Sequence, residues 1–181
     1  MEELLKDLLN NSFDPKTDSP MKLPDTPGAY LVSAKGIDIL PTVMKELNFK
    51  TVNGLPVIYV GIAGRPTSKV KSLRKRDYKT HFEGTARRST LRKSLGVLFN
   101  FQKEFENQES NSKYKFIRQQ EEQLTEWMKE NLVMNFVTIG NPMEFEKFMI
   151  KTYEPPLNLK DNYSETNREF RQELKKLRIL R

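Results

Sequence analysis

Two short apolar runs, each carrying a tyrosine close to a glycine, constrain the fold of this chain more than any other feature. Gly28-Ala29-Tyr30 opens the first run, and Tyr59-Val60-Gly61 closes the second. Both runs are too short for a typical buried helix and are bounded by turn residues, so they predict strands. The turn signal Asn53-Gly54 comes just before the second run. We therefore expect two adjacent strands joined by an elaborated hairpin.

The remainder of the chain follows mostly helical patterns. Helices are predicted at about 2–9, at 68–82, from Ser89 or Thr90 to about 98, at 116–131, from Asn141 to about Tyr153 and at 166–179, with a third strand at 132–139. We expect the polar segments 10–27 and 107–113 to be a linker arm and a loop. This order predicts an α+β fold: a small three-stranded antiparallel sheet flanked by helices, with extra helices at both termini.

The predicted elements divide the chain into three parts. Residues 1–27 form an N-terminal helix and linker arm, residues 28–160 form the main domain, and residues 161–181 form a C-terminal amphipathic helix. We expect the last helix to pack on the main domain or to extend it. With 181 residues, the chain is long enough to bury a sizeable core.

The composition excludes several classes of chemistry and location. The absence of cysteine excludes disulfides, thiolate metal sites and thiol nucleophiles. The single histidine, His81, excludes sites that need several imidazoles, as most zinc sites do unless carboxylates replace them. No apolar run approaches the about 20 residues of a membrane helix, and the first residues lack a signal-peptide pattern. We therefore expect a cytoplasmic protein with no membrane partner.

Positive charge is concentrated in one stretch of the chain. The net charge is +7, and residues 65–93 hold eleven Lys or Arg against only two acidic residues. Such a concentration is typical of a surface that meets a polyanion, although a merely solvated face is the simpler explanation. The predicted nucleic-acid-binding residues are Lys69, Lys71, Lys75, Lys79, Arg87, Arg88, Arg92 and Lys93.

Glu146 is the acidic residue best suited to hold a metal ion. Its helix has an apolar stripe at Phe145, Phe148, Met149 and Thr152. Glu146 lies at the margin of that stripe, near Ile150, and not on the far, solvated side. A lone glutamate is usually an ordinary surface residue. Mg²⁺, however, often takes one or two protein carboxylates and completes its shell with water and substrate phosphate, so one acid is enough.

Arg74 and Arg76 are the two candidates for binding a phosphate next to His81. In an α-helix Arg74, seven residues before His81, shares its face, whereas Arg76, five residues before, diverges by about 140°. Arg76 would therefore need a bulge, or a helix that ends before His81. The alternative is that all these cations make nonspecific phosphate contacts.

Tyr30 and Tyr59 fit both a packing role and a catalytic one. As a general base, a phenol of pKa near 10 loses its proton near neutrality at a cost of about 4 kcal/mol. A metal ion, a neighbouring cation or concerted proton transfer offsets that cost. Gly28 and Gly61 let backbone or substrate approach closely. Asn158, which follows two prolines, either holds the end of a strand or contacts substrate.

In their order, these motifs resemble the GIY-YIG nuclease superfamily. Gly28-Ala29-Tyr30 stands for the first signature and Tyr59-Val60-Gly61 for the second. The basic helix, the Glu146 helix and Pro155-Pro156-Leu157-Asn158 then follow in family order. The resemblance spans about residues 28–158 and leaves the terminal helices outside.

The resemblance implies a nuclease domain that uses one divalent metal ion, Mg²⁺ or Mn²⁺. Glu146 would ligate the metal, and Tyr59 or Tyr30 would activate water or relay its proton. An arginine, Arg74 or Arg76, would bind the scissile phosphate. Linear alignment with the family favours Arg76, whereas the helix faces favour Arg74.

The resemblance also implies supporting roles. His81 would assist proton transfer or contact phosphate, and Asn158 would support the site. Because the gap between the tyrosine motifs is longer than the short hairpin of the family, we expect residues 35–53 to be an insertion.

The leading hypothesis is therefore a divalent-metal-dependent endonuclease that hydrolyses DNA phosphodiester bonds at a single site. RNA presents the same phosphates, and the sequence fits a monomer or a homodimer. A nucleic-acid-binding module with a vestigial nuclease site explains the charge equally well. A third hypothesis is a protein-interaction domain that uses the two terminal amphipathic helices.

Overall fold

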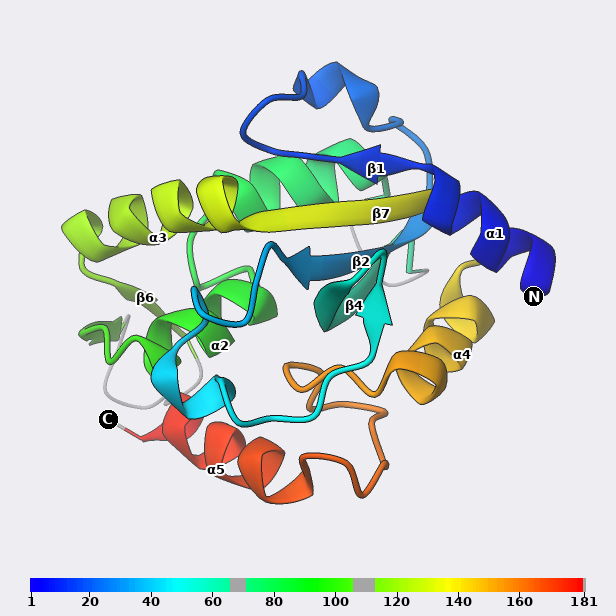
Figure 1. Ribbon diagram of the computed structural model, residues 1–181. Helices are drawn as coiled ribbons and strands as arrows, with labels where there is room; N and C mark the ends of the chain where they lie inside the picture. The colour runs from blue at the N-terminus through cyan, green and yellow to red at the C-terminus, as the bar shows by residue number, and fades with distance from the viewer. Residues whose placement is uncertain (66–70, 106–112, 181) are drawn as a thin grey trace.

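A five-stranded antiparallel sheet lies at the centre of the protein (Figure 1). The computed structural model describes residues 1–65, 71–105 and 113–180. The sheet order is β1-β7-β2-β4-β3. The strands are β1 (Ser12–Phe13), β2 (Gly28–Ala34), β3 (Thr51–Val52), β4 (Leu55–Ala63) and β7 (Leu132–Thr138). The three long strands were predicted; the expected number of three was wrong, because β1 and β3 add a short strand at each edge.

The pairing of β2 with β4 confirms the predicted neighbouring strands and places both tyrosines on one face. Tyr30 lies opposite Gly61, and Val32 lies opposite Tyr59. Residues opposite each other and residues two apart share a face, so the two phenols are diagonal neighbours. A Cβ atom on Gly61 would lie 2.3 Å from the Tyr30 hydroxyl oxygen. The glycine of the second motif therefore makes room for the tyrosine of the first.

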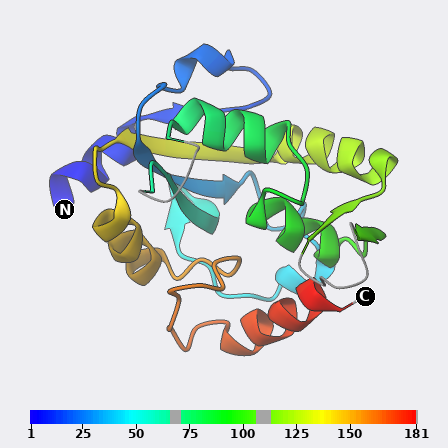
Figure 2. The ribbon, with the colours of Figure 1, turned by 180° about the vertical axis from the view of Figure 1, so that it is seen from behind.

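Helices cover both faces of the sheet. The face with the tyrosines carries η3 (Arg74–Phe82), α2 (Thr90–Leu98) and α3 (Arg118–Asn131), and Figure 2 shows η3 and α3 along the sheet from behind. The opposite face carries α1 (Glu2–Asn10) and α4 (Met143–Tyr153). The last helix, α5 (Arg168–Ile179), packs against α2. Smaller elements are the 3₁₀ turns η1 (Pro20–Lys22) and η2 (Thr42–Met44), and a hairpin of β5 (Lys103–Phe105) and β6 (Tyr114–Phe116).

Three predicted elements differ from the structure. The basic helix is a π-helix, η3, and the expected helix start at 116 is strand β6, with α3 beginning at Arg118. The predicted linker arm contains β1, whose Phe13 is fully buried because β1 pairs with β7. In addition, Asn141 makes no cap, since Pro142 stands at the N-cap of α4.

Two predicted features near the ends of elements are confirmed. The hairpin from β3 to β4 turns at Asn53 and Gly54, which both have positive φ, as that turn requires. α4 ends at Tyr153, just before the two prolines. Among the described residues, no helix is long and apolar enough to cross a membrane.

Candidate active site

A pocket of about 610 Å³ lies beside the outer edge of β4 and brings several predicted site residues together. Tyr59, Arg76, Glu146, Asn158 and Lys93 all line it. They come from β4, η3, α4, the segment after α4, and α2, respectively. The pocket therefore joins a phenol, two cations, a carboxylate and an amide that are distant in the sequence.

The edge of β4 is closed by the segment that follows α4. Glu154 ends α4 in the left-handed conformation, with φ 47°, and the two prolines turn the chain toward β4. The Leu157 amide then donates to the Ile58 carbonyl at 3.1 Å. The Asn158 side chain accepts from the Val60 amide at 2.8 Å and donates to the Val60 carbonyl at 2.9 Å. Asn158 thus holds the strand, which is one of its two predicted roles, and contact with substrate stays a prediction.

This closure explains how Glu146 reaches the tyrosine side of the sheet. Its helix covers the opposite face, with Phe145 and Met149 in the core there. Glu146 and Ile150, one turn apart, border the pocket at the sheet edge, as the predicted margin position indicates. Thr152 is exposed, so its predicted place on the buried stripe was wrong.

The Glu146 carboxylate is buried and held by one partner. Its residue is 7% exposed, and Arg65 Nη2 donates to its two oxygens at 2.6 and 2.5 Å. Burial raises the pKa of Glu146 above its ordinary value, and the Arg65 cation opposes that rise. Asp161, which also lines the pocket, adds to the rise. Because desolvation disfavours the charged form of this carboxylate, a nearby cation would stabilise that form.

Tyr59 is the tyrosine that faces the pocket. Its hydroxyl makes a 2.9 Å hydrogen bond with Thr90 Oγ1, at the start of α2. Tyr30 is fully buried and lies behind Tyr59, with the two ring centroids 6.3 Å apart. Tyr30 is not among the residues that line the pocket. The structure therefore separates two tyrosines that the sequence treated alike.

A buried chain of hydrogen bonds supports Tyr30. Its hydroxyl lies 2.6 Å from His81 Nε2, and His81 Nδ1 lies 2.6 Å from Ser89 Oγ. Burial lowers the pKa of His81 well below its ordinary value, with Arg76 and Arg92 adding to the effect, so the imidazole is neutral. A neutral imidazole donates from one nitrogen and accepts at the other, so it joins the two hydroxyls.

The π-helix changes which of Arg74 and Arg76 lies on the same face as His81. Hydrogen bonds in a π-helix join residues five apart, so residues at that spacing stack above one another. Arg76 and His81 have that spacing, and the Arg76 charge acts on His81. Arg76 lines the pocket, whereas Arg74 Nε donates to the Leu23 carbonyl at 2.9 Å, on the other side of the helix. The preference for Arg74, which assumed an α-helix, was wrong.

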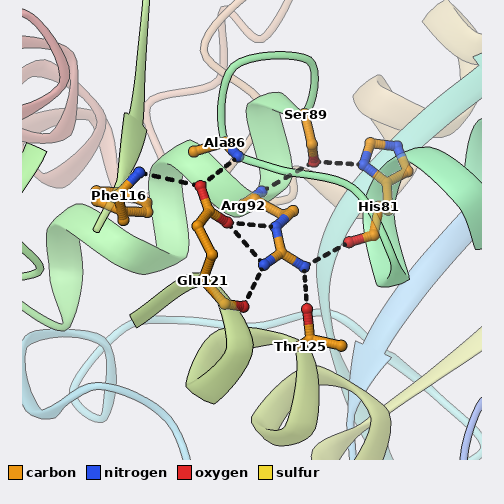
Figure 3. A network of polar contacts seen from close by, with 7 residues as sticks. All are labelled: His81, Ala86, Ser89, Arg92, Phe116, Glu121 and Thr125. Carbon is orange, nitrogen blue, oxygen red and sulfur yellow. Dashed lines mark hydrogen bonds and ion pairs between the residues drawn. The ribbon is translucent and has the colours of Figure 1, made fainter. Parts of the chain in front are cut away.

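The predicted phosphate-binding role of Arg92 was also wrong. Arg92 is fully buried and donates to the Glu121 carboxylate and to the His81 carbonyl (Figure 3). A side chain without exposed surface cannot contact a DNA backbone. Its neighbour Ser89 caps α2 through the Arg92 amide, as the predicted helix start indicates.

The other predicted DNA-binding cations differ in exposure. Lys71, Lys75, Lys79, Arg87 and Arg88 are exposed. Lys93 is half-buried and lines the pocket. Lys69 lies outside the described residues. For this exposed group, contact with a DNA backbone stays a prediction.

Several residues that line the pocket were missed as site residues, among them Arg65 and Arg178. Arg65 follows β4 by two residues and was counted only within the basic stretch. Arg178 belongs to α5 and lines the pocket beside Lys175. The sequence carries no local signal for either residue, because each reaches the pocket through the path of the chain.

The arrangement offers few protein ligands for a metal. Across residues 1–65, 71–105 and 113–180, no group of three or more histidine or acidic side chains is placed to hold an ion. Glu146 and Asp161 are the carboxylates of the pocket. An ion at Glu146 would therefore complete its shell with water and substrate oxygens, as Mg²⁺ often does.

Comparison with known proteins adds one finding to this geometry. The sequence matches the GIY-YIG catalytic domain over residues 28–179, a range that also covers α5, which the sequence analysis had left outside the resemblance. Neither the curated proteins nor the solved structures contain a significant match. The chain belongs to the GIY-YIG nuclease superfamily.

Proposed function

We propose that this nuclease-family protein is a divalent-metal-dependent endonuclease that hydrolyses DNA phosphodiester bonds at one site. The observation that carries the proposal is the pocket at the edge of β4. There Tyr59, Arg76 and Glu146 face one cavity from three separate elements. A proton acceptor, a phosphate-binding guanidinium and a metal-binding carboxylate are the groups that phosphodiester hydrolysis requires.

Glu146 is the residue that would hold Mg²⁺ or Mn²⁺. It fits a cation because its buried carboxylate borders the cavity and has a raised pKa from desolvation. A bound ion would neutralise charge that develops on the phosphate. Arg65 already contacts both carboxylate oxygens, so the ion and Arg65 compete for the same group.

Tyr59 and Arg76 act on the substrate directly. Tyr59 would relay the proton of the attacking water, giving its own phenolic proton to solvent as it accepts that of the water, because its hydroxyl is the phenol that borders the cavity. Arg76 donates to the phosphate oxygens, which stabilises negative charge in the transition state. Tyr30 and His81 are positioning residues: they pack behind Tyr59, with the His81 ring 5.9 Å from the Tyr59 ring.

Cleavage of supercoiled, linear and branched DNA with Mg²⁺, Mn²⁺ or chelator tests the proposal. Glu146→Gln should give no product with either ion while DNA binding persists. Glu144→Gln is the matched control, since Glu144 lies in the same helical turn but is exposed and paired with Lys147. Cleavage by Glu146→Gln at the rate of Glu144→Gln would contradict the metal role.

The Arg65 contact favours one alternative, a DNA-binding module with a vestigial site. In that case Arg65 would occupy Glu146 permanently, and the exposed cations would bind DNA without cleavage. Salt-sensitive DNA retention with no product under any divalent ion would support this alternative. The choice between DNA and RNA, a monomeric or dimeric state, and a cytoplasmic location stay predictions.

A further inference from the structure

The C-terminal helix forms a second wall of the active-site pocket. Arg178, Lys175 and Ile179 of α5 line the same cavity as Tyr59 and Glu146. The helix is anchored, because its Leu174 is buried in the main core. The wall is therefore a fixed part of the site.

The last turn of α5 is held in place by β5. Lys103 Nζ donates to the carbonyl of Leu177 at 2.6 Å and to that of Leu180 at 2.5 Å. These two bonds bracket Arg178 along the chain. The guanidinium therefore extends from a backbone that is fixed on both sides.

Arg178 is a half-buried cation that lines the pocket together with Tyr59 and Lys93. Burial lowers the pKa of Arg178, and the phenols of Tyr114 and Tyr59 oppose that effect. Among the described residues, none gives its guanidinium a hydrogen bond or an ion pair. Burying a guanidinium without an anion is unfavourable, so the site is incomplete as it stands.

Lys93 makes the same wall more positive. It lines the pocket from α2, and the charge of Arg178 lowers the pKa of Lys93 in addition to the effect of burial. Because the two positive charges repel each other, an anion bound beside both would be stabilised by both. Lys175, one turn before Arg178, adds a third positive side chain.

The charges in the pocket therefore separate into two groups. On the side of α4, Arg65 is paired with Glu146 and Lys160 lies 4.0 Å from Asp161. On the side of α5 and α2, those charged residues that line the pocket and lie within the described part of the chain are all basic. An anionic ligand would therefore be stabilised most on the side of α5 and α2.

We propose that Arg178, together with Lys93 and Lys175, binds a second substrate phosphate, next to the one that is cleaved. The pocket then holds one strand at two consecutive phosphates, with the scissile one between Arg76 and Glu146. This inference rests on the proposed nuclease function for the identity of the scissile phosphate. The phosphate-binding wall itself follows from the charges of α5 and α2.

Binding measurements on Arg178→Gln test the wall. In the Glu146→Gln protein, which binds without cutting, Arg178→Gln should weaken the affinity for a short DNA duplex about tenfold, as loss of one charge-assisted contact does. The slope of log affinity against log salt should fall by about 0.9. Arg178→Lys should restore part of the loss. A common melting temperature for all variants shows that they fold.

Lys176→Gln is the matched control for the same helix. Lys176 is exposed and paired with Glu173, and its removal subtracts the same charge from α5. Lys176→Gln should leave the affinity and the slope nearly unchanged. Equal effects of Arg178→Gln and Lys176→Gln would overturn the proposal, because only overall charge would then matter.

Neutral methylphosphonate linkages, placed one at a time, locate the bound phosphate. The linkage next to the mapped cleavage position should weaken binding to the parent Glu146→Gln protein, and Arg178→Gln should add no further loss there. The proposal would be overturned if the two losses of affinity, from the neutral linkage and from Arg178→Gln, multiplied at every position tested. It would also be overturned if the linkage at which Arg178→Gln adds no further loss lay far from the cleavage position.

The two proposals fail in distinguishable ways. If the wild-type protein cleaves DNA but the effects of Arg178→Gln and of the neutral linkages are independent at every position, the proposal of a second phosphate site is overturned and the nuclease function stands. If Arg178→Gln adds no further loss at one neutral linkage but no divalent ion supports cleavage, the proposed nuclease function is overturned. The basic wall then stands as a phosphate-binding site, and its place beside a scissile phosphate is overturned.

Discussion

Two arginine–glutamate pairs in this protein have opposite surroundings. Arg92 and Glu121 lie inside the fold, where the Arg92 side chain is 0% exposed (Figure 3). Arg65 and Glu146 lie in the pocket, where the Arg65 side chain is 36% exposed. Both contacts are short, at 2.8 and 2.5 Å. Distance alone therefore does not separate them.

The difference lies in how completely each pair is bonded to its surroundings. Arg92 also donates to the His81 carbonyl, the Thr125 hydroxyl and the Glu121 carbonyl. The Glu121 carboxylate in turn accepts from the amides of Ala86 and Phe116. Glu121 thus ties together the loop before α2, the strand β6 and the helix α3.

Within the described part of the chain, the pocket pair has no comparable set of supports. Both oxygens of Glu146 meet the same nitrogen of Arg65, and burial still raises the pKa of the carboxyl. A saturated pair is a structural support, whereas a pair in a cavity with few other bonds is exchangeable. The comparison teaches that a functional ion pair is recognised by a carboxylate that can exchange its arginine for another cation, and not by the length of the contact.

The largest expected effect comes from breaking each pair at its arginine. Arg92→Met leaves the Glu121 carboxylate buried without its cation, so the free energy of unfolding should fall by about 3–5 kcal/mol. Arg65→Met removes a partner that is 36% exposed and leaves the Glu146 carboxyl beside an open cavity, so the free energy of unfolding should fall by less than in Arg92→Met. Urea unfolding, with the slope compared between variants, measures both. Equal losses would contradict the distinction between the pairs.

A smaller effect is expected on metal binding. Arg65→Gln removes the cation that competes for Glu146, so Mn²⁺ should bind about tenfold more tightly in the absence of DNA. Lys147→Gln is the control, since Lys147 is an exposed cation of α4 paired with Glu144. Calorimetry without DNA measures the ion alone. Unchanged Mn²⁺ affinity in Arg65→Gln would show that the pocket pair is not exchangeable toward a metal.

The fold could be predicted where the sequence has long apolar runs. Strands β2, β4 and β7 are such runs, and the burial of Leu91 and Leu95 follows from their spacing in α2. Strands β1 and β3 have two residues each, too few to show a period of two. Their pairing is decided by tertiary position, which local patterns do not contain.

The site could be predicted only in part, for two physical reasons. Glu146 was identified by its place beside an apolar stripe, a local pattern. Arg92 was misassigned because a charge count does not reveal burial, and its partner Glu121 lies 29 residues away. The helix-face argument favoured Arg74 over Arg76 because the π-helix changes which residues share a face, and apolar spacing does not reveal that change.

The smallest expected effect is on the pH dependence of stability, which should differ in sign between the structural region around Arg92 and the pocket around Glu146. His81 belongs to the structural region, since its carbonyl accepts from Arg92, and burial, Arg76 and Arg92 lower its pKa. Below about pH 6.5 the unfolded chain therefore binds the proton more readily. The stability that His81 contributes is thus present above that pH and lost as the pH falls, by at most about 1.4 kcal/mol per unit. Glu146 has the opposite sign: burial raises its pKa, so its contribution falls as the pH rises through that value.

Urea unfolding at several pH values measures how the stability contributed by His81 depends on pH. The range is about pH 5.5 to 7.5, one unit on either side of the ordinary histidine pKa. The experiment is done in the Glu146→Gln background, which removes the opposing carboxyl. Because the chain has a single histidine, His81→Gln should abolish most of the remaining dependence on pH in this window. Its stability deficit relative to the parent should therefore shrink as the pH falls. A deficit that stays constant with pH would mean that folding leaves the proton affinity of His81 unchanged, so that its imidazole takes up a proton in the folded protein below about pH 6.5. The Tyr30–His81–Ser89 chain would then carry a charge next to Arg76, and the structural region would share the electrostatics of the pocket.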